Sequence, residues 1–405
     1  MRWILFSVIG IVMSCRQDSS YGIFQIDISN ISNNNATKLV EIDLVPVDTA
    51  FKLFIDTLAI PFQTEDWNDN GIVDKLFFIL ELPPRSEYKI TATPVDSFHF
   101  PSARTQVVLK RQTLDYDPQN PFRLSNEYVN ARQIQVPPDL IAQNTWIWHE
   151  GIAWENEIIG YRAYLDRRSI FDIFGKITSR LVLDTITGDL HEMQSWGADI
   201  LQIGTSFGIG SPGIYDFDSI YTFSNYKAKN VEILASGPIR SIVRIDFLGL
   251  QIRGEEIDIR MYLEMVSGRH WTEVKLQTLR NERLNIVYAT GITRRPRTTG
   301  LVQGKELKTD FCYTFGLQAS HGENMGMAIL IPDKYDVDVH HSNPESHILL
   351  IHPINDEVTY RFMATWEKGP RGINDEVDFI NLVRNYAKAF TLEDSIRVHY
   401  LPSIE

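Results

Sequence analysis

Cysteine is almost absent from the 405-residue chain, which contains only Cys15 and Cys312. Two cysteines allow at most one disulfide, and no internal disulfide forms if Cys15 is modified. A chain of this length can instead be stabilised by hydrophobic cores, in one large domain or two ordinary ones.

Basic residues are also few, because 39 Lys and Arg stand against 52 Asp and Glu, for a formal net charge of -13. Without a basic field to gather phosphates, nucleic acid is excluded as a partner. The chain also lacks a nucleophile elbow, a catalytic-triad spacing, a dinucleotide-binding fingerprint and a CxxC pair. An acidic glycan would have to be met by local arginines such as Arg162, Arg167 and Arg168.

Long hydrophobic runs are missing except for WILFSVIGIVM, which follows Met1 and Arg2. This run is too short to span a membrane and is typical of a secretory signal. Ser14 before Cys15 resembles a bacterial lipobox, which implies a lipidated Cys15 and a signal peptide with tether over residues 1–20. We then expect an outer-membrane lipoprotein of the cell envelope, on its periplasmic or surface face, touching the membrane through the lipid alone. The alternative is an ordinary signal peptide with an incidental Cys15.

The dominant hydrophobic period along the chain is two, as in FQIDIS (24–29) and DIRMYLEMV (258–266). Strict alternation predicts half-buried strands, so the chain is expected to be all-β. The exception is INDEVDFINLVRNYAKAF (373–390), where apolar residues recur at helical spacing after Asn374 or Asp375. One amphipathic C-terminal helix is therefore predicted to pack on a sheet.

A domain boundary is predicted near residues 113–140, where prolines and polar residues interrupt the strand pattern. Residues 21–115 are long enough for a small β-sandwich. Residues 116–405 have the size of a large two-sheet sandwich that would carry the glycan site.

A calcium-loop pattern lies in the small domain, in the segment TEDWNDNGIVDKLFF. The possible ligands are Asp66, Asn68, Asn70 and Asp74, with Gly71 at the sharp turn. Phe77 stands where a bidentate Glu would complete the loop. The alternative is a β-hairpin with an Asn70-Gly71 turn and no Ca²⁺.

Ionisable and aromatic side chains are concentrated in residues 146–176, a span that otherwise alternates like strands. Sugars stack on aromatic rings, and acidic sugars need guanidinium partners. A binding site for an oligo- or polysaccharide is therefore predicted in this span, and it is expected to extend to Trp196 in the following segment. The expected substrate-binding residues are Trp148, Glu150, Trp154, Arg168 and Trp196.

The predicted catalytic residues are His149, Glu155, Arg162 and Tyr164. Strand parity groups His149 with Glu155, and Arg162 with Tyr164. Arg162 would neutralise a uronate carboxylate while His149 or Tyr164 moves the C5 proton, which is β-elimination. His149 could equally be a hydrogen-bonded residue of the sandwich, and each arginine a surface salt bridge.

Five blocks in order along the chain resemble the DUF4861 family: 149–176, SWGADILQIGTSFGIGSPGI (195–214), ATGI (289–292), GENMGMAILIP (322–332) and ATWEKGPRGINDEVDFINLV (364–383). Its members are similar to the large β-sandwiches of the galactose-mutarotase and polysaccharide-lyase type, and occur among glycan-degradation proteins of Bacteroidetes. The resemblance implies a galactose-mutarotase-like supersandwich and a carbohydrate substrate. It supplies no catalytic set.

Several functions remain open from the residues alone. Glu155 and a second carboxylate could hydrolyse glycosides, and His149 with a Glu could interconvert anomers. A non-catalytic glycan-binding lipoprotein would use the same aromatic and arginine residues on an open face, whereas an enzyme needs them in a deep cleft. A purely structural surface protein is the third possibility. Oligomeric state does not follow from the sequence.

Overall fold

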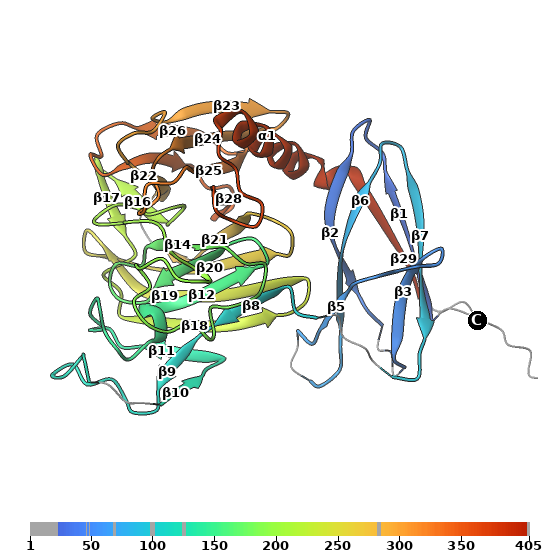
Figure 1. Ribbon diagram of the computed structural model, residues 1–405, viewed down its shortest axis with the longest axis horizontal. Coiled ribbons are helices and arrows are strands. Elements are labelled where there is room, and N and C mark those ends of the chain that lie inside the picture. The colour runs from blue at the N-terminus through green and yellow to red at the C-terminus, as the bar shows by residue number, and fades with distance from the viewer. Residues whose placement is uncertain are drawn as a thin grey trace, which may run out of the picture.

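The computed structural model describes residues 23–45, 47, 49–67, 70–97, 102–123, 127–281 and 285–402. Cys15, the predicted signal peptide and Asn68 lie outside these ranges. The described chain forms a small and a large β-sandwich that lie side by side, with one α-helix above their junction (Figure 1).

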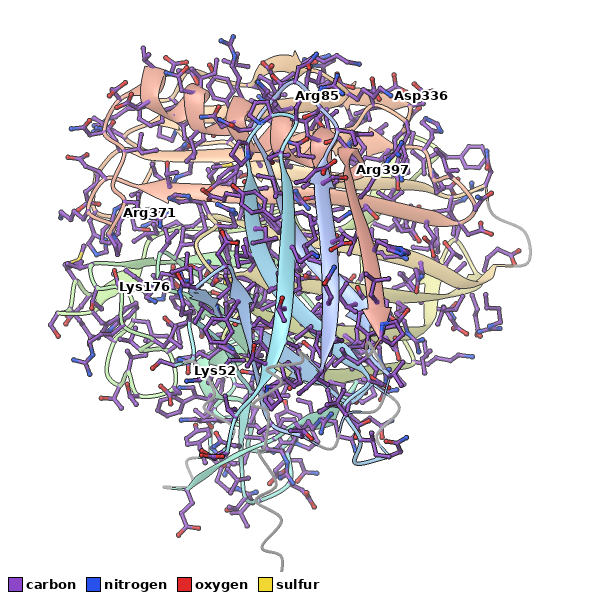
Figure 2. The ribbon with its side chains drawn as sticks, turned by 90° about the vertical axis from the view of Figure 1, so that its right-hand side faces the viewer. Lys52, Arg85, Lys176, Asp336, Arg371 and Arg397 are labelled. Carbon is purple, nitrogen blue, oxygen red and sulfur yellow. The ribbon has the colours of Figure 1, made fainter. Side chains whose placement is uncertain are left out.

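The small sandwich contains two antiparallel sheets built from alternating strands, such as FQIDISN, in which every second residue is buried. In spatial order the first sheet contains β29 (Ile396–Pro402), β1 (Phe24–Asn30), β7 (Glu87–Pro94), β3 (Phe51–Ile55) and β4 (Leu58–Ile60). The second contains β2 (Ala36–Asp43), β6 (Lys75–Leu82) and β5 (Gln63–Glu65). The first sheet faces the viewer in Figure 2, in front of the large sandwich.

The large sandwich is built on a nine-stranded antiparallel sheet. Its order is β11 (Gln133–Val136), β18 (Ala228–Ser236), β19 (Arg240–Ile252), β20 (Glu255–Val266), β21 (Trp271–Asn281), β28 (Glu357–Trp366), β25 (Met325–Pro332), β24 (Thr309–Gly316) and β23 (Val302–Glu306). Its inner face packs into one continuous core with two five-stranded sheets.

The two five-stranded sheets complete the second layer of the large sandwich. One has the order β15 (Gly197–Asp199), β14 (Phe171–Lys176), β13 (Gly160–Tyr164), β12 (Gly151–Asn156) and β8 (Thr105–Val108). The other has the order β17 (Ser219–Thr222), β16 (Gly213–Asp216), β22 (Val287–Thr293), β27 (Ser346–Ile351) and β26 (Val337–His340). A short pair, β9 (Lys110–Gln112) and β10 (Tyr128–Asn130), lies beside them, and the 3-10 helix η1 (Trp148–Glu150) precedes β12.

Helix α1 (Glu376–Leu392) covers the outer face of the nine-stranded sheet and is followed by the 3-10 helix η2 (Glu393–Ser395). Asp375 caps it, because its carboxylate accepts the amide of Asp378 at 3.0 Å. Phe379 and Val383 bury their side chains against β24, β25 and β28. The prediction of an all-β fold with a small sandwich, a large supersandwich and one C-terminal helix is confirmed.

The pairing of the strands departs from the predicted ranges 21–115 and 116–405. β8 pairs with β12 of the large sandwich, and β29 pairs with β1 of the small one. The chain therefore enters the large sandwich before residue 115 and returns to the small sandwich at its C-terminal end (Figure 1).

No helix within the described ranges is both long and apolar enough to cross a membrane.

Candidate functional site

The predicted segment 146–176 folds into η1 and the neighbouring strands β12, β13 and β14. Arg162 pairs in register with Ala153 on one side and with Asp172 on the other. Paired residues point to the same face, so Glu155, Arg162 and Tyr164 share one face of this sheet, with Tyr164 reaching the main core at its edge. That face is covered by the segment that follows β14.

His149 lies in η1 and not in a strand, so parity does not place its side chain. Its φ is +58°, in the left-handed region, and the following Glu150 also has φ +58°. The Nε2 atom of His149 lies 2.8 Å from the carbonyl oxygen of Leu183. Burial, together with the nearby Arg162 and against the opposing hydrogen bond to Leu183, lowers the pKa of His149 to about 4, so the ring is neutral near pH 7.

Glu155 is fully buried and is engaged entirely by protein groups. It forms an ion pair with Lys176 at 2.5 Å and accepts the amides of Val182 and Leu183, both at 2.6 Å. Gln106 donates to the same carboxylate at 2.5 Å. Glu155 therefore anchors the segment after β14 to the sheet.

Arg162, Tyr164, Asp172 and Asp199 form what we call the arginine cluster. Arg162 contacts Asp172 at 2.5 Å and Asp199 at 2.6 Å, and it also donates to the hydroxyl of Tyr164. Tyr164 donates to Asp172 at 2.8 Å. Burial and the adjacent Asp172 raise the pKa of Asp199 well above its usual range, against the opposing effect of Arg162.

The predicted substrate-binding residues occupy two different environments. Trp154 and Trp196 are 1% and 6% exposed and pack in cores, which corrects their expected ligand contact. Trp148, Glu150 and Arg168 are half-buried at the edge of the sheet, where Arg168 and Glu150 form an ion pair at 2.7 Å. The buried Nε1 atom of Trp148 has no hydrogen-bond partner among the described residues.

The predicted calcium loop connects β5 to β6. The Asp66 carboxylate accepts the amides of Asn70 at 3.2 Å and Gly71 at 2.6 Å, while Asp74 accepts the amide of Trp67 at 2.9 Å. These bonds are those of the hairpin alternative. Within the described ranges, no three His, Cys, Asp or Glu side chains gather as a metal site, and Ca²⁺ at this loop stays a prediction.

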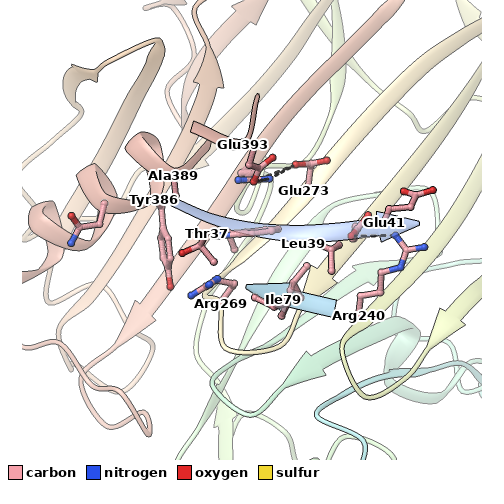
Figure 3. A pocket seen from close by; sticks show the side chains of 15 residues that line it. Thr37, Leu39, Glu41, Ile79, Arg240, Arg269, Glu273, Tyr386, Ala389 and Glu393 are labelled. Carbon is pink, nitrogen blue, oxygen red and sulfur yellow. Dashed lines mark hydrogen bonds and ion pairs between the residues drawn. The ribbon is translucent and has the colours of Figure 1, made fainter. Parts of the chain in front are cut away.

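A cavity of about 300 Å³ lies where the small sandwich, the nine-stranded sheet and α1 meet. Strands β2 and β6 form one wall, β19, β20, β21 and β28 form the second, and α1 with η2 closes the third (Figure 3). Its volume is at the lower end of the range for small-molecule sites. We call it the junction cavity.

Three neighbouring strands place charged side chains side by side on the cavity floor. Glu273 in β21 is paired in register with Glu264 in β20 and with Arg361 in β28. Arg361 bonds Glu273 and Glu393 at 2.8 Å each and lies over the ring of Trp271, 4.0 Å from its centroid. Glu273 is therefore fixed in position by a buried guanidinium.

Glu264 is a carboxyl group of the cavity with a raised pKa. Its burial raises its pKa to about 7, and Glu273 adds to that shift against the opposing effect of Arg240. Its side chain is 23% exposed, and as a lining residue it has surface on the cavity. Glu264 and Glu273 thus lie opposite each other in different surroundings, and the raised pKa of Glu264 suits a general acid.

Tyr386, on α1, shares one end of the cavity with Arg269 (Figure 3). The Tyr386 hydroxyl lies 3.0 Å from Nδ1 of His270. Burial lowers the pKa of His270 to about 3, so its ring is neutral and Nδ1 can accept a hydrogen bond from the Tyr386 hydroxyl. The only ion pair of Arg269 among the described residues is a 3.7 Å contact with the exposed Glu81. Its guanidinium is therefore largely available to a ligand.

No sequence pattern singles out the junction cavity. Glu264 lies in a segment predicted as an ordinary strand, and Tyr386 belongs to the predicted apolar stripe of the helix. The alternation that includes Tyr262 and Glu264 is also typical of a solvated strand face. No local signal therefore distinguishes these residues from ordinary surface residues. Only the tertiary arrangement brings them opposite Arg269.

The fold and the cavity define an all-β, two-sandwich protein with a charged, ligand-sized cavity at the sandwich junction. The chain belongs to the family described as domain of unknown function (DUF4861), whose family model matches residues 28–397. The resemblance found in the sequence is thus confirmed. No curated protein matches the chain.

Two solved structures are similar to the chain, each with 10% sequence identity, a TM-score of 0.46 and 94% of this chain covered. One is a protein in the glycosyl hydrolase family 38 from Enterococcus faecalis, of which 48% is covered. The other is an alpha-mannosidase from Enterococcus faecalis V583, of which 46% is covered. The chain spans about half the length of these two proteins.

Proposed function

We propose that the chain is a carbohydrate-active enzyme that acts on uronate-containing, pectin-like glycan fragments in the junction cavity, by a lyase-type reaction. The observation that carries the proposal is the 3.0 Å contact between the Tyr386 hydroxyl and His270 Nδ1, beside Arg269. These are the residue types that uronate elimination requires.

In the proposed reaction, Arg269 binds the uronate carboxylate and stabilises the charge that develops when C5 loses its proton. Tyr386 takes the C5 proton as its phenolate, which burial disfavours and the Arg269 guanidinium favours through their opposing effects on the Tyr386 pKa. The C4–O bond breaks, a C4–C5 double bond forms, and Tyr386 passes that proton to the departing oxygen, which restores the phenolate. Tyr386 touches the substrate, whereas His270 acts through Tyr386 as a positioning residue.

We place proton transfer in the junction cavity because the catalytic residues predicted from the sequence are already bonded to protein groups. Arg162 is held by Asp172 and Asp199, and Glu155 by Lys176. A uronate would have to displace Asp172 or Asp199 to reach the guanidinium of Arg162.

The proposal is tested with residues 21–405 incubated with uronate glycans, with and without Ca²⁺, while the ultraviolet absorbance of the unsaturated product is followed. Tyr386→Phe should reduce the rate by about 100-fold or more, the usual contribution of general acid–base catalysis. Tyr313→Phe is the matched control, because Tyr313 contacts Glu376 of the same helix outside the cavity. Absence of the unsaturated product in the unsubstituted chain would refute the lyase reaction.

Glycoside hydrolysis is the second candidate, favoured by the opposed Glu264 and Glu273. Side chains directly opposite on antiparallel strands have Cβ atoms about 4.5–5.5 Å apart, compatible with the short carboxyl separation of retaining enzymes. Glu264 would be the acid and Glu273 the nucleophile. New reducing ends without the unsaturated product, with a rate that falls as pH rises above about 7, would support this reaction.

Non-catalytic glycan binding and mutarotation would each give a distinct outcome in the same assay. Saturable binding of the glycan without any product would identify a non-catalytic glycan-binding protein. Faster equilibration of sugar anomers without cleavage would identify a mutarotase.

We also propose that Cys15 is lipidated and anchors the chain in the cell envelope. The support is the apolar run of residues 3–13 followed by Ser14 and Cys15. Cys15→Ser should abolish incorporation of labelled fatty acid and release the protein from the membrane fraction. Equal incorporation in both proteins would contradict the anchor.

A further inference from the structure

A second hollow of about 630 Å³ lies directly beside the junction cavity. It is lined by residues 63–66 around β5, residues 130–132 after β10, and residues 233–238 at the end of β18. Arg240 lines the junction cavity, Glu65 lines the second hollow, and the two side chains form a bidentate pair at 3.0 and 2.8 Å. One ion pair therefore forms the partition between the two spaces.

An exposed tryptophan lies on this partition. Trp67 is 53% exposed, although its Nε1 donates to Glu65 at 2.7 Å. The guanidinium of Arg240 lies 5.7 Å from its ring centroid and the ammonium of Lys75 lies 5.3 Å away. A hydrogen bond and two cations thus hold the ring in place while half of its surface remains open to solvent. The open face of the ring is therefore available to stack against a ligand.

The second hollow also offers a cation for an acidic sugar. Arg132 is exposed in its wall, and it forms no ion pair with any carboxylate of the described residues. The neighbouring wall is held rigidly, because Gln63 accepts the amides of Ile239 and Arg240 at 2.9 and 3.0 Å. A fixed wall, an aromatic platform and an available guanidinium are the components of a saccharide subsite.

We infer that Trp67, Arg132 and this second hollow form an additional saccharide subsite, continuous with the junction cavity past the Arg240–Glu65 pair. The inference rests on the proposed function, since it assigns the neighbouring sugars of the same acidic glycan to this hollow. The ligand is an oligosaccharide long enough to cover both spaces. One sugar stacks on Trp67, and a uronate carboxylate pairs with Arg132.

The subsite is tested by titration calorimetry with galacturonic acid and tetragalacturonate, on residues 21–405 carrying Tyr386→Phe so that the ligand is not consumed. Trp67→Ala should weaken tetragalacturonate binding by about tenfold, and Trp67→Phe should retain most of it. Arg132→Gln should weaken tetragalacturonate binding in the same direction. Binding of the monosaccharide should stay within about twofold in all three variants, because it fits in the junction cavity alone. Phe217→Ala is the matched control, since Phe217 is 78% exposed in another hairpin.

This titration distinguishes failure of the second subsite from failure of the proposed uronate function. If neither sugar binds the unsubstituted chain, the proposed uronate function fails, and the subsite fails with it. If both sugars bind with equal affinity, or if Trp67→Ala weakens both to the same extent, the junction cavity stands and the second subsite is refuted.

Discussion

At the scale of single residues, Arg162 is held by two buried carboxyl groups with different surroundings. Asp172 also accepts the Tyr164 hydroxyl, whereas burial and the adjacent Asp172 raise the pKa of Asp199 well above its usual range. A raised pKa at Asp199 reduces the excess negative charge that the buried cluster carries, which lowers the free-energy cost of burying it.

This difference predicts unequal effects of two isosteric substitutions. Asp172→Asn should reduce the free energy of unfolding by about 3–5 kcal/mol, since it removes the buried carboxyl group that pairs with Arg162 and also accepts the Tyr164 hydroxyl. Asp199→Asn should reduce it by less than about 1 kcal/mol, since the raised pKa of Asp199 favours its neutral form, which an amide resembles. Urea denaturation at neutral pH measures both, and equal losses would contradict the difference between the two carboxyl groups.

Glu264 should make the folded chain less stable as pH rises. Its pKa is about 7 in the folded chain against a usual 4.5, so the folded state binds the proton more tightly. The contribution of protonated Glu264 to the free energy of unfolding is therefore fully present below about pH 4.5 and is lost as pH rises through about 7. Glu264→Gln should remove this loss, which we expect to be about 2 kcal/mol.

The measurement is the thermal midpoint of both proteins from pH 5 to pH 8. The unsubstituted chain should lose stability relative to Glu264→Gln over this interval. A constant difference between the two proteins would show that Glu264 titrates normally.

At the scale of elements, α1 approaches the nine-stranded sheet closely because β25 has a glycine beneath it. A Cβ atom on Gly326 would lie 2.4 Å from Cε2 of Phe379, whose ring is fully buried. This contact fixes the height of α1 above the sheet and hence the position of Tyr386 at the cavity.

Gly326→Ala should therefore destabilise the chain by about 1–3 kcal/mol, the usual effect of overpacking a core. The double variant Gly326→Ala with Phe379→Leu should recover part of the loss, because the smaller side chain makes room for the methyl group. Chemical denaturation of the three proteins measures this coupling. A Gly326→Ala variant as stable as the unsubstituted chain would show that α1 moves freely at this contact.

At the scale of the whole molecule, the two sandwiches share an apolar interface as well as the junction cavity. Leu39 in β2 and Ile79 in β6 pack against the cluster that α1 forms on the large sheet. The two units are consequently expected to unfold together.

Calorimetry should show one unfolding transition for the unsubstituted chain. Substituting both Leu39 and Ile79 by Asp buries charge at the interface and should split this transition in two, with the small sandwich unfolding first. Leu58→Asp is the control, because Leu58 is 70% exposed on the same sandwich. Two transitions in the unsubstituted chain would contradict the coupling.

Much of this architecture could be predicted from local sequence signals. The alternation in β1 matches its burial pattern, and Asp375 caps the helix at the predicted position. His149 and Glu150 have left-handed backbone conformations, but neither residue is a glycine that would indicate this in the sequence. Strand parity is therefore applied to His149 although its backbone is not part of a strand. Periodicity describes only the residues of one element, and it fails where the backbone leaves that element.

The junction cavity could not be predicted, because its residues are distant in sequence. His270 and Tyr386 are separated by 116 positions and meet only when α1 packs on the large sheet. Arg240 likewise meets Glu65 across 175 positions. Each of these side chains has an ordinary role within its own element, and the site appears only at the level of tertiary structure.

The pairing of β29 with β1 also sets the order in which the molecule can be completed. Domains usually fold as the ribosome releases them, starting from the N-terminus. Here one edge of β1 stays unpaired until β29 has been made, since Phe24 pairs with Pro402 and Asn30 with Ile396. An open strand edge invites pairing with other chains. Translation that stops before residue 396 would therefore leave the small sandwich with an open edge, and a nascent chain would need that edge shielded until β29 emerges.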